Sequence, residues 1–432
     1  MKRKMKMTIV LMTLSVLLAA GCAANQKDEE KVTLTFMHRW TMEPMKSATE
    51  EMIAEFEKEN PDIEIETITA TNDSYKQKIK TVINSDNPPD IFFTWGDEYL
   101  DKFVREGLVL DLRQQLEDSG TMNDLEESQM TAFEYEDGIY GIPVKIDAKL
   151  WFYNKDVYER LGLTPPETYE EFLEQLEIIQ AAGITPIYFG NSDPYAGAHY
   201  LTTLNQKCVP EETLKADYSL EDGSFSDPGY LQALQIYEDL HKYMNQDTAA
   251  YDWSFSYSGL INQECALVYD QYVTIADSME MDEEFTKEHL GVFPFPEIEG
   301  ARGNQEIITG TPDGYAISSK TEHPEEAFRF LQYTLSKENT LRYLEEGYWV
   351  NGTKDMFENL SDYTDIQPLL DGMEYIKKSP GTTPWLDTEL DPKIAQTYLN
   401  GLQQIDTGEI TAEQLMQQIQ QAAKSAKYEK GD

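Results

Sequence analysis

Cysteine and histidine are scarce in this chain, which has three cysteines and five histidines among its 432 residues. The histidines show no metal-ligand spacing, and the sequence contains no CxxC, HExxH, GxSxG, P-loop or GxGxxG motif. These absences argue against a zinc site, a nucleotide cofactor and the common classes of hydrolase. A glycosidase needs only two carboxylates about 5–9 Å apart, which no motif reveals. Because the metal, cofactor and hydrolase motifs are absent, we expect no metal and no cofactor, and we favour a protein that is not an enzyme.

Basic residues are also few. The chain has 35 Lys and Arg against 79 Asp and Glu, a formal charge of −44, and the acids are spread along its length. This surplus repels phosphate backbones, so we expect no nucleic-acid binding. Hydrophobic residues make up 40% of the chain and aromatic residues 11%, which excludes wholesale disorder. The length predicts two or three domains, or two large lobes.

One hydrophobic run stands out, Met7–Ala20, and it follows a basic N-terminus. It is shorter than the ~20 residues that a membrane-spanning helix needs. Small residues precede Cys22, so the segment resembles a bacterial lipoprotein signal. The resemblance implies that residues 1–21 are removed, that Cys22 carries lipid, and that residues 22–31 tether the protein to the extracellular face of the bacterial cell membrane. An ordinary cleaved signal with an incidental cysteine is the alternative.

The other two cysteines, Cys208 and Cys265, could form one disulfide outside the cell. A single pair without framework spacing does not require one. Two buried free thiols are an equally good interpretation, so the sequence leaves the pairing open.

Hydrophobic periodicity in the body of the chain predicts alternating strands and helices. Val32, Leu34 and Phe36 alternate with threonines, which indicates a strand, and an amphipathic helix follows over residues 45–56. A second strand at 63–67, a second helix and a buried strand at 91–93 continue the pattern. This order is typical of a largely parallel sheet covered on both faces, so we expect an α/β protein.

Four stretches of sequence resemble family 1 extracellular solute-binding proteins, the sugar-capturing subunits of ATP-driven importers. Their order and spacing together carry the resemblance. The stretches are Pro89-Asp90-Ile91-Phe92 with residues 103–112, Gly138-Ile139-Tyr140-Gly141-Ile142-Pro143 with residues 151–155, Gly291-Val292-Phe293-Pro294-Phe295-Pro296, and Gly310-Thr311-Pro312-Asp313-Gly314-Tyr315-Ala316-Ile317.

The resemblance implies a two-lobe, type II periplasmic-binding-protein-like fold, with a ligand cleft between lobes that short hinge crossovers join. The crossovers would lie near 143–145 and 290–296. The first lobe would comprise 32–143 plus 295–347, and the second 144–294 plus 348–425. Such a monomer would capture a carbohydrate, an oligosaccharide by expectation, through hinge closure and deliver it to the membrane permease of an ABC importer.

The chemistry of sugars indicates which side chains to expect in the cleft. A sugar has an apolar C–H face and a rim of hydroxyls, which an aromatic plate and planar polar side chains match. In open α/β sheets a ligand lies beyond the carboxyl ends of strands. Strand-end placement, loop-borne tryptophans and the family resemblance select His38, Arg39, Trp40, Glu43, Asp97, Lys145, Asp147, Asp193, Trp253, Asp270, Tyr272, Asp313, Gly314, Trp349 and Trp385. For Trp95, a core position and a ligand contact are equally good interpretations, whereas Trp151 should be core.

Two other functions remain open at this point. An acidic cleft with aromatic walls also suits a cationic small molecule such as a polyamine, through cation–π contacts. A surface lipoprotein that cleaves polysaccharide is the less favoured enzyme alternative. Tryptophan mixed with varied polar groups favours sugar, whereas a cage of carboxylates and aromatics alone would favour a cation.

Overall fold

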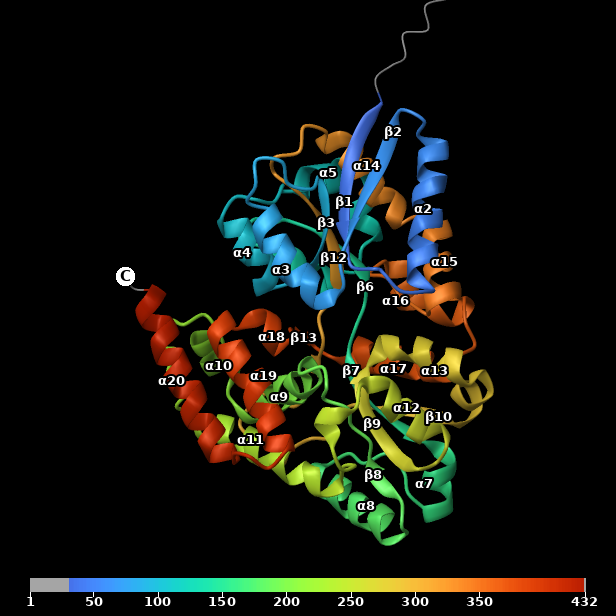
Figure 1. Cartoon of the computed structure of the whole chain (residues 1–432). Coiled ribbons are helices and arrows are strands. Elements are labelled where there is room, and N and C mark those ends of the chain that lie inside the picture. Colours follow the sequence, from blue (N-terminus) through green and yellow to red (C-terminus); the bar gives the residue numbers. More distant parts are fainter. Residues whose placement is uncertain (1–30, 431–432) are drawn as a thin grey trace, which may run out of the picture.

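The computed structural model describes residues 31–430, and it shows two α/β lobes, each built on its own sheet (Figure 1). This confirms the predicted fold class. The predicted signal segment 1–21, the lipidation site Cys22 and all but the last residue of the predicted tether lie outside the described residues.

The first lobe, at the top of Figure 1, has a five-stranded sheet of order β2-β1-β3-β12-β6. β1 is parallel to β2 and β3, whereas β12 runs antiparallel to β3 and β6. The strands are β1 Val32–His38, β2 Ile63–Thr69, β3 Ile91–Trp95, β6 Ile142–Lys145 and β12 Asp313–Ile317, with the hairpin β4 Glu134–Tyr135 and β5 Gly138–Ile139. The helices are α2 Met45–Glu59, α3 Asn72–Val82, α4 Glu98–Arg105, α5 Arg113–Ser119, α6 Glu127–Met130, α14 Pro324–Thr334 and α15 Lys337–Gly347.

The second lobe has a four-stranded sheet of order β10-β7-β9-β8. Its strands are β7 Lys149–Asn154, β8 Thr185–Ile187, β9 Cys265–Gln271 and β10 Leu290–Phe293, and the short pair β11 Ile308–Thr309 and β13 Thr382–Thr383 lies beside it. Its helices are α7 Lys155–Leu161, α8 Tyr169–Ala181, α9 Tyr195–Cys208, α10 Glu211–Tyr218, α11 Pro228–Leu240, α12 Trp253–Ile261, α13 Ile275–Met281, α16 Lys354–Asn359, α17 Gln367–Lys378, α18 Leu386–Glu389, α19 Pro392–Asp406 and α20 Ala412–Lys430.

Separate hydrophobic cores hold the two lobes. In the first, Leu34 and Phe36 of β1 pack with Met52 and Phe56 of α2, as the sequence periodicity predicts. The second sheet has a core on each face, because alternate residues of β7 point to opposite sides. Trp151 lies fully buried in one of them, which confirms its predicted core position.

The chain crosses between the lobes three times, between β6 and β7, between β11 and β12, and between α15 and α16. Hydrogen bonds join the first and third crossings: the Ile146 N–H donates to the Val350 carbonyl at 2.7 Å, and the Gly352 N–H donates to the Pro143 carbonyl at 3.2 Å. The crossings therefore run side by side through the joint between the lobes.

The return to the first lobe comes later than the predicted boundary at residue 295. Phe295 and Ile298 belong to the second lobe's core, where the Phe295 ring lies 6.0 Å from the Trp151 ring. The chain stays with the second lobe until β11 and enters β12 at Asp313. The predicted crossover at 290–296 is thus a buried strand end, because its apolar run fills that core.

Cys208 and Cys265 are both free and buried, so the pair that the sequence left open does not form a disulfide. Burial raises the pKa of the Cys208 thiol to about 12. Between residues 31 and 430, no helix combines the length and the apolar character that crossing a bilayer requires.

The packing of the crossings predicts a strong effect of one glycine substitution. Gly310 has φ +146°, and a Cβ there would lie 2.4 Å from the Asp147 carbonyl oxygen of the neighbouring crossing. We expect Gly310→Ala to lower the free energy of unfolding by about 1–3 kcal/mol, since the two crossings must move apart. Denaturant unfolding of both proteins measures the change.

The matched control is Gly381→Ala, because no atom lies within 4 Å of a Cβ built there. Its unfolding free energy should stay within about 0.5 kcal/mol of the parent protein. Equal losses in the two variants would contradict the close approach at Gly310.

Candidate ligand-binding cleft

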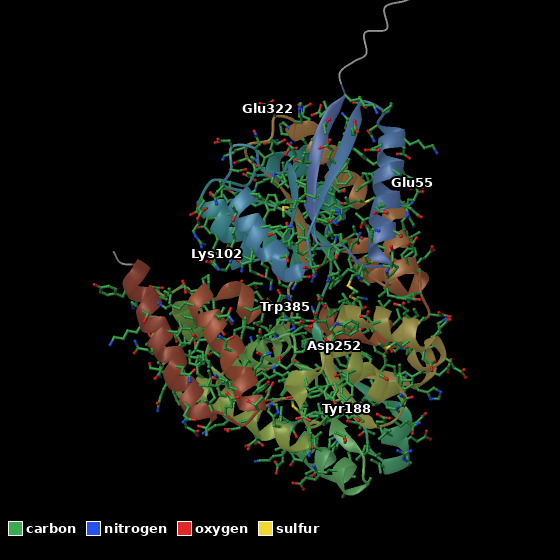
Figure 2. All side chains as sticks on the ribbon, in the orientation of Figure 1. Glu55, Lys102, Tyr188, Asp252, Glu322 and Trp385 are labelled. Carbon is green, nitrogen blue, oxygen red and sulfur yellow. The ribbon has the colours of Figure 1, made fainter. Side chains whose placement is uncertain are left out.

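A cleft of about 620 Å³ lies between the lobes and is lined from both sides. The first lobe contributes the loop after β1, the start of α3 and the end of β3. The second lobe contributes residues that follow β8 and β9, together with the start of α18. Figure 2 shows Trp385 at this boundary. Because no single lobe forms the cleft, its shape depends on how the lobes meet.

Four of the six tryptophans gather at this cleft, although they are far apart in the sequence. Trp40 and Trp349 meet edge to face with ring centroids 4.5 Å apart, and Trp40 donates its indole N–H to the Tyr315 hydroxyl at 2.9 Å. Trp95 and Trp385 complete the aromatic wall. Trp40, Trp95 and Trp385 are buried in this arrangement of the lobes, and Trp349 is half-buried, so the indoles form a wall whose faces are largely covered by the protein's own side chains.

The buried carboxylate of Asp313 bridges two cationic side chains at the base of the cleft, Arg39 and Lys145. Asp313 Oδ2 lies 2.9 Å from an Arg39 guanidinium nitrogen and 2.8 Å from Lys145 Nζ. Asp147 Oδ2 lies 3.7 Å from the same Lys145 nitrogen. The shared carboxylate fixes both cations in place and offsets part of their charge, so the cleft presents oriented N–H donors.

Asp147 also positions an amide of the second lobe, next to which it lies. The Gln271 side chain lines the cleft and donates to Asp147 Oδ2 at 2.6 Å. Burial raises the pKa of Asp147 to about 6, against the pull of nearby Lys145. Asp147 itself lies behind the cleft wall, where it contacts Gln271 and Lys145.

Three buried polar atoms at the cleft lack a hydrogen-bond partner among the described residues, and one of them is the carboxylate oxygen Asp387 Oδ1. The other two are nitrogens, Arg39 Nε in the first lobe and His199 Nδ1 in the second. His199 stacks on Trp385 with ring centroids 4.1 Å apart, and burial lowers its pKa well below the ordinary value, so the ring is neutral. Since a buried unpaired polar group costs free energy, hydroxyls of a ligand would be favourable partners for both atoms.

Seven of the predicted site residues line the cleft, namely Arg39, Trp40, Glu43, Lys145, Asp193, Trp349 and Trp385. Asp147 and Asp313 lie directly behind the cleft wall; Asp147 contacts Lys145, and Asp313 contacts both Lys145 and Arg39. The structure does not bring the other six to the cleft.

Three of these six are core residues. His38 stacks on Phe36 and accepts the Trp40 backbone N–H, and burial lowers its pKa to about 4. Tyr272 is fully buried and donates to the Leu369 carbonyl at 2.7 Å. Gly314 lies against Phe133, whose ring a Cβ would approach to 2.3 Å. Packing, not ligand contact, accounts for each.

The remaining three have local partners elsewhere. Asp270 pairs with Lys149 at 3.2 Å, and Trp253 begins α12 and packs on the second lobe's core. Asp97 accepts the Thr311 hydroxyl at 2.7 Å, and burial raises its pKa to about 6. Asp97 therefore ties the first lobe to the return crossing.

Sequence reasoning missed several residues that line the cleft: Asn72, Lys76, Tyr195, His199, Gln271, Asp277 and Asp387. Trp95, which the sequence left undecided, also lines it. Gln271 ends β9, so the strand-end rule could have found it. No sequence signal places Asp387 near the first lobe. Within residues 31–430, no cluster of His, Cys, Asp or Glu is arranged to hold a metal.

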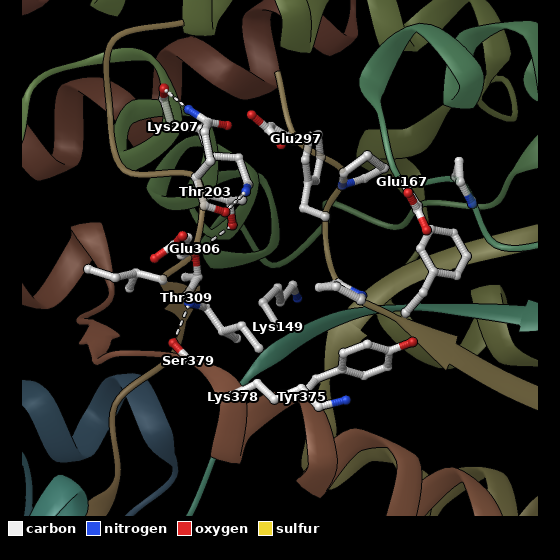
Figure 3. A pocket seen from close by; sticks show the side chains of 18 of the residues that line it. Lys149, Glu167, Thr203, Lys207, Glu297, Glu306, Thr309, Tyr375, Lys378 and Ser379 are labelled. Atoms are coloured by element: carbon white, nitrogen blue, oxygen red, sulfur yellow. Dashed lines mark hydrogen bonds between the residues drawn. The ribbon is translucent and has the colours of Figure 1, made fainter. Parts of the chain in front are cut away.

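A further cavity of about 530 Å³ lies within the second lobe (Figure 3). Lys149, Thr203, Lys207 and Tyr375 surround it, and all come from second-lobe elements. A ligand held there would contact only one lobe, so this cavity does not link binding to lobe closure as the cleft does.

Comparison with known proteins identifies a family. Residues 40–341, well over half of the chain, match the family model described as bacterial extracellular solute-binding protein. The chain is 24% identical over 375 residues to the multiple sugar-binding protein of Streptococcus mutans, an alignment that covers 82% of this chain and 83% of that protein.

Two further similarities point the same way. The melibiose/raffinose/stachyose-binding protein MelE of Bacillus subtilis is 28% identical over 205 residues, which cover 45% of this chain and 46% of that protein. A protein solved in work on xylan utilization by the thermophilic bacterium Caldanaerobius polysaccharolyticus superposes with a TM-score of 0.80 at 25% identity, covering 90% of this chain and 99% of that one.

The shared carboxylate predicts a large effect of Asp313→Asn. The substitution removes the common partner of the buried Lys145 and the half-buried Arg39 and leaves Lys145 with Asp147 alone, so we expect it to lower the free energy of unfolding by about 3 kcal/mol. Asp62→Asn is the control, because Asp62 pairs with Arg329 at the surface, at 3.5 Å. The control should change stability by less than about 1 kcal/mol. Similar losses in denaturant unfolding would show that Asp313 does not hold this network.

Proposed function

The chain belongs to the bacterial extracellular solute-binding proteins, and from this premise we propose that it captures an oligosaccharide between its lobes for an ABC importer. The observation that carries the proposal is the cleft itself, where tryptophans and oriented polar groups from both lobes converge. Aromatic plates and planar hydrogen-bonding groups are the two surfaces that a sugar requires. The relatives named for multiple sugars and for melibiose, raffinose and stachyose support the ligand class.

Capture would proceed by hinge closure about the three crossings. Arg39 Nε and His199 Nδ1 lie on opposite lobes, so a sugar can satisfy both only when the lobes are together. The ligand then shifts the population toward the closed form by its greater affinity for that form. The closed pair of lobe surfaces would dock on the membrane permease, which delivers the sugar across the membrane.

The lipid anchor at Cys22 remains a prediction from the sequence. An anchored protein is confined to the membrane plane, which raises its effective concentration near the permease. The N-terminal sequence and its family support this arrangement at the extracellular face of the membrane.

The arrangement of charge in the cleft favours sugar over a polyamine. The protein's own cations already lie over the indole faces: Arg39 is 4.6 Å from the Trp40 ring centroid, Lys145 is 5.2 Å from that of Trp349, and Lys76 is 5.1 Å from that of Trp95. A cationic ligand would meet like charges at the sites where cation–π attraction would hold it. The enzyme alternative has no comparable support, and incubation with oligosaccharides followed by product analysis tests it.

A ligand screen tests the proposed function. We expect at least one sugar, in a panel of oligosaccharides, uronates and amines, to raise the melting temperature and to reduce the radius of gyration in X-ray scattering. Binding to the folded form alone raises stability, by about 2.7 kcal/mol at a hundredfold excess over Kd. Stabilisation by polyamines alone, or by no member of the panel, would contradict the proposal.

Tryptophan variants then locate the site. We expect Trp349→Ala and Trp385→Ala to weaken binding of that sugar at least about tenfold, because each removes a plate from the cleft wall. Trp253→Ala is the matched control, since Trp253 is a half-buried tryptophan outside the cleft. Titration calorimetry should give the control an unchanged Kd, and an equal loss in all three would place the sugar elsewhere.

A further inference from the structure

A second cavity between the lobes adjoins the ligand cleft. It measures about 620 Å³ and lies between α3 and α4 of the first lobe and α18 and α19 of the second. The two cavities share Lys76, Tyr195, Asp387 and Thr388 in their walls. In Figure 2, Lys102 marks the first-lobe side of this region and Trp385 the boundary next to it. A ligand longer than the first cleft can therefore extend into the second cavity.

Contacts across the lobes form this second cavity. Lys76 Nζ of α3 lies 2.7 Å from Asp387 Oδ2 of α18, and Lys102 Nζ of α4 donates to the Thr388 carbonyl at 3.2 Å. The walls come from different lobes, so the cavity exists only while the lobes are together. Any group bound there takes part in closure.

The cavity is basic although the chain as a whole is strongly acidic. Lys76, Lys80 and Lys102 line it, and only two carboxylates, Asp387 and Glu106, are among its lining residues. Lys76 and Lys80 lie one turn apart on α3, which brings them to the same side of that helix. Tyr99, Phe103 and Tyr195 add aromatic surface beside them.

These lysines differ in how far nearby carboxylates offset their charge. Lys102 lies 4.0 Å from Glu98, which also holds Arg105 through bonds of 2.9 and 2.6 Å, and the carboxylates of Glu389 and Asp391 offset its charge further. For Lys80, the described part of the chain provides no carboxylate within ion-pair distance of its ammonium. Burial is the main cause that lowers the pKa of Lys80; Lys102 and Lys76 lower it further, and Asp391 opposes the shift.

We propose that this lysine-lined cavity binds a carboxylate of the captured sugar, so that the preferred ligand is an acidic oligosaccharide carrying a uronic acid. The inference rests on the proposed function and deepens it. Neutral sugar rings would pack on the indoles of the first cleft, while the acid group extends past the Lys76–Asp387 pair to Lys80 and Lys102. An ammonium group binds a carboxylate through a charge-assisted hydrogen bond, which a neutral hydroxyl cannot match.

The test compares each neutral sugar with its acidic counterpart by titration calorimetry. The probes are galactotriose against trigalacturonic acid, and xylotetraose against xylotetraose bearing one glucuronic acid. We expect the acidic member of a binding pair to bind about two- to fivefold more tightly at low salt, a range typical of exposed charge pairs. The preference should fall toward parity near 1 M salt, where screening reaches about 3 Å, while neutral binding stays constant.

A matched pair of lysine variants assigns the preference to the cavity. Lys80→Gln should abolish most of it and leave the Kd of the neutral sugar unchanged. Lys78→Gln removes the same charge from an exposed position of the same helix that does not line the cavity, and it should keep the preference. Lys80 suits this purpose better than Lys102, because Lys102 also bridges the lobes.

The outcomes separate this inference from the function on which it rests. Equal or tighter binding of the neutral members overturns the acidic preference and leaves sugar capture standing. An acidic preference that survives Lys80→Gln, or that Lys78→Gln removes equally, also overturns it. Inorganic phosphate that binds as tightly as the acidic sugar would show a site for a free anion instead. Failure of every sugar in the panel removes the proposed function and the inference together.

Discussion

The shared contact of Asp313 with Arg39 and Lys145 is the constraint on which the cleft depends. Lys145 ends β6 just before the first crossing, and Asp313 begins β12 just after the return crossing. The Lys145–Asp313 contact, 2.8 Å long, therefore pins two crossings at one point, and it lies at the base of the cleft. Because the carboxylate is buried, its attraction for both cations is stronger than at the surface, and its loss would take the carboxylate partner from Arg39 and leave Lys145 with Asp147 alone.

The aromatic wall follows from the same contact. Arg39 lies over Trp40, and Lys145 lies between Trp40 and Trp349, 5.7 and 5.2 Å from their ring centroids. Fixing the cations thus also restricts the indoles, with the Tyr315 hydroxyl as a further support for Trp40. Preorganised side chains lose less conformational entropy on binding, so this network prepares a surface before a ligand arrives.

The sequence predicted the architecture better than the individual site residues. Periodicity located β1, α2 and β3, and strand-end placement led to Arg39, Trp40 and Lys145 at the cleft. The same rule was wrong for Tyr272, because the chain turns inward after β9 and buries that ring beneath Leu369. Periodicity shows that a residue follows a strand but not toward which side the chain turns. Asp387 and His199 are contributed by long-range packing of the second lobe, which no local pattern encodes.

Closing two lobes of so acidic a chain brings like charges together, and this shapes the boundary between them. With 79 acids against 35 bases, closure costs electrostatic free energy that grows as the lobes approach. The basic side chains at the boundary oppose that cost: Lys76 reaches Asp387 across the lobes, and Lys102 reaches the backbone carbonyls of α18. Lys76 and Lys102 thus have two roles, because they contact the opposite lobe and also line the second cavity between the lobes. Under the proposed lobe closure, charge at the boundary and charge on the ligand are therefore coupled, and a change in either would alter the balance between open and closed forms.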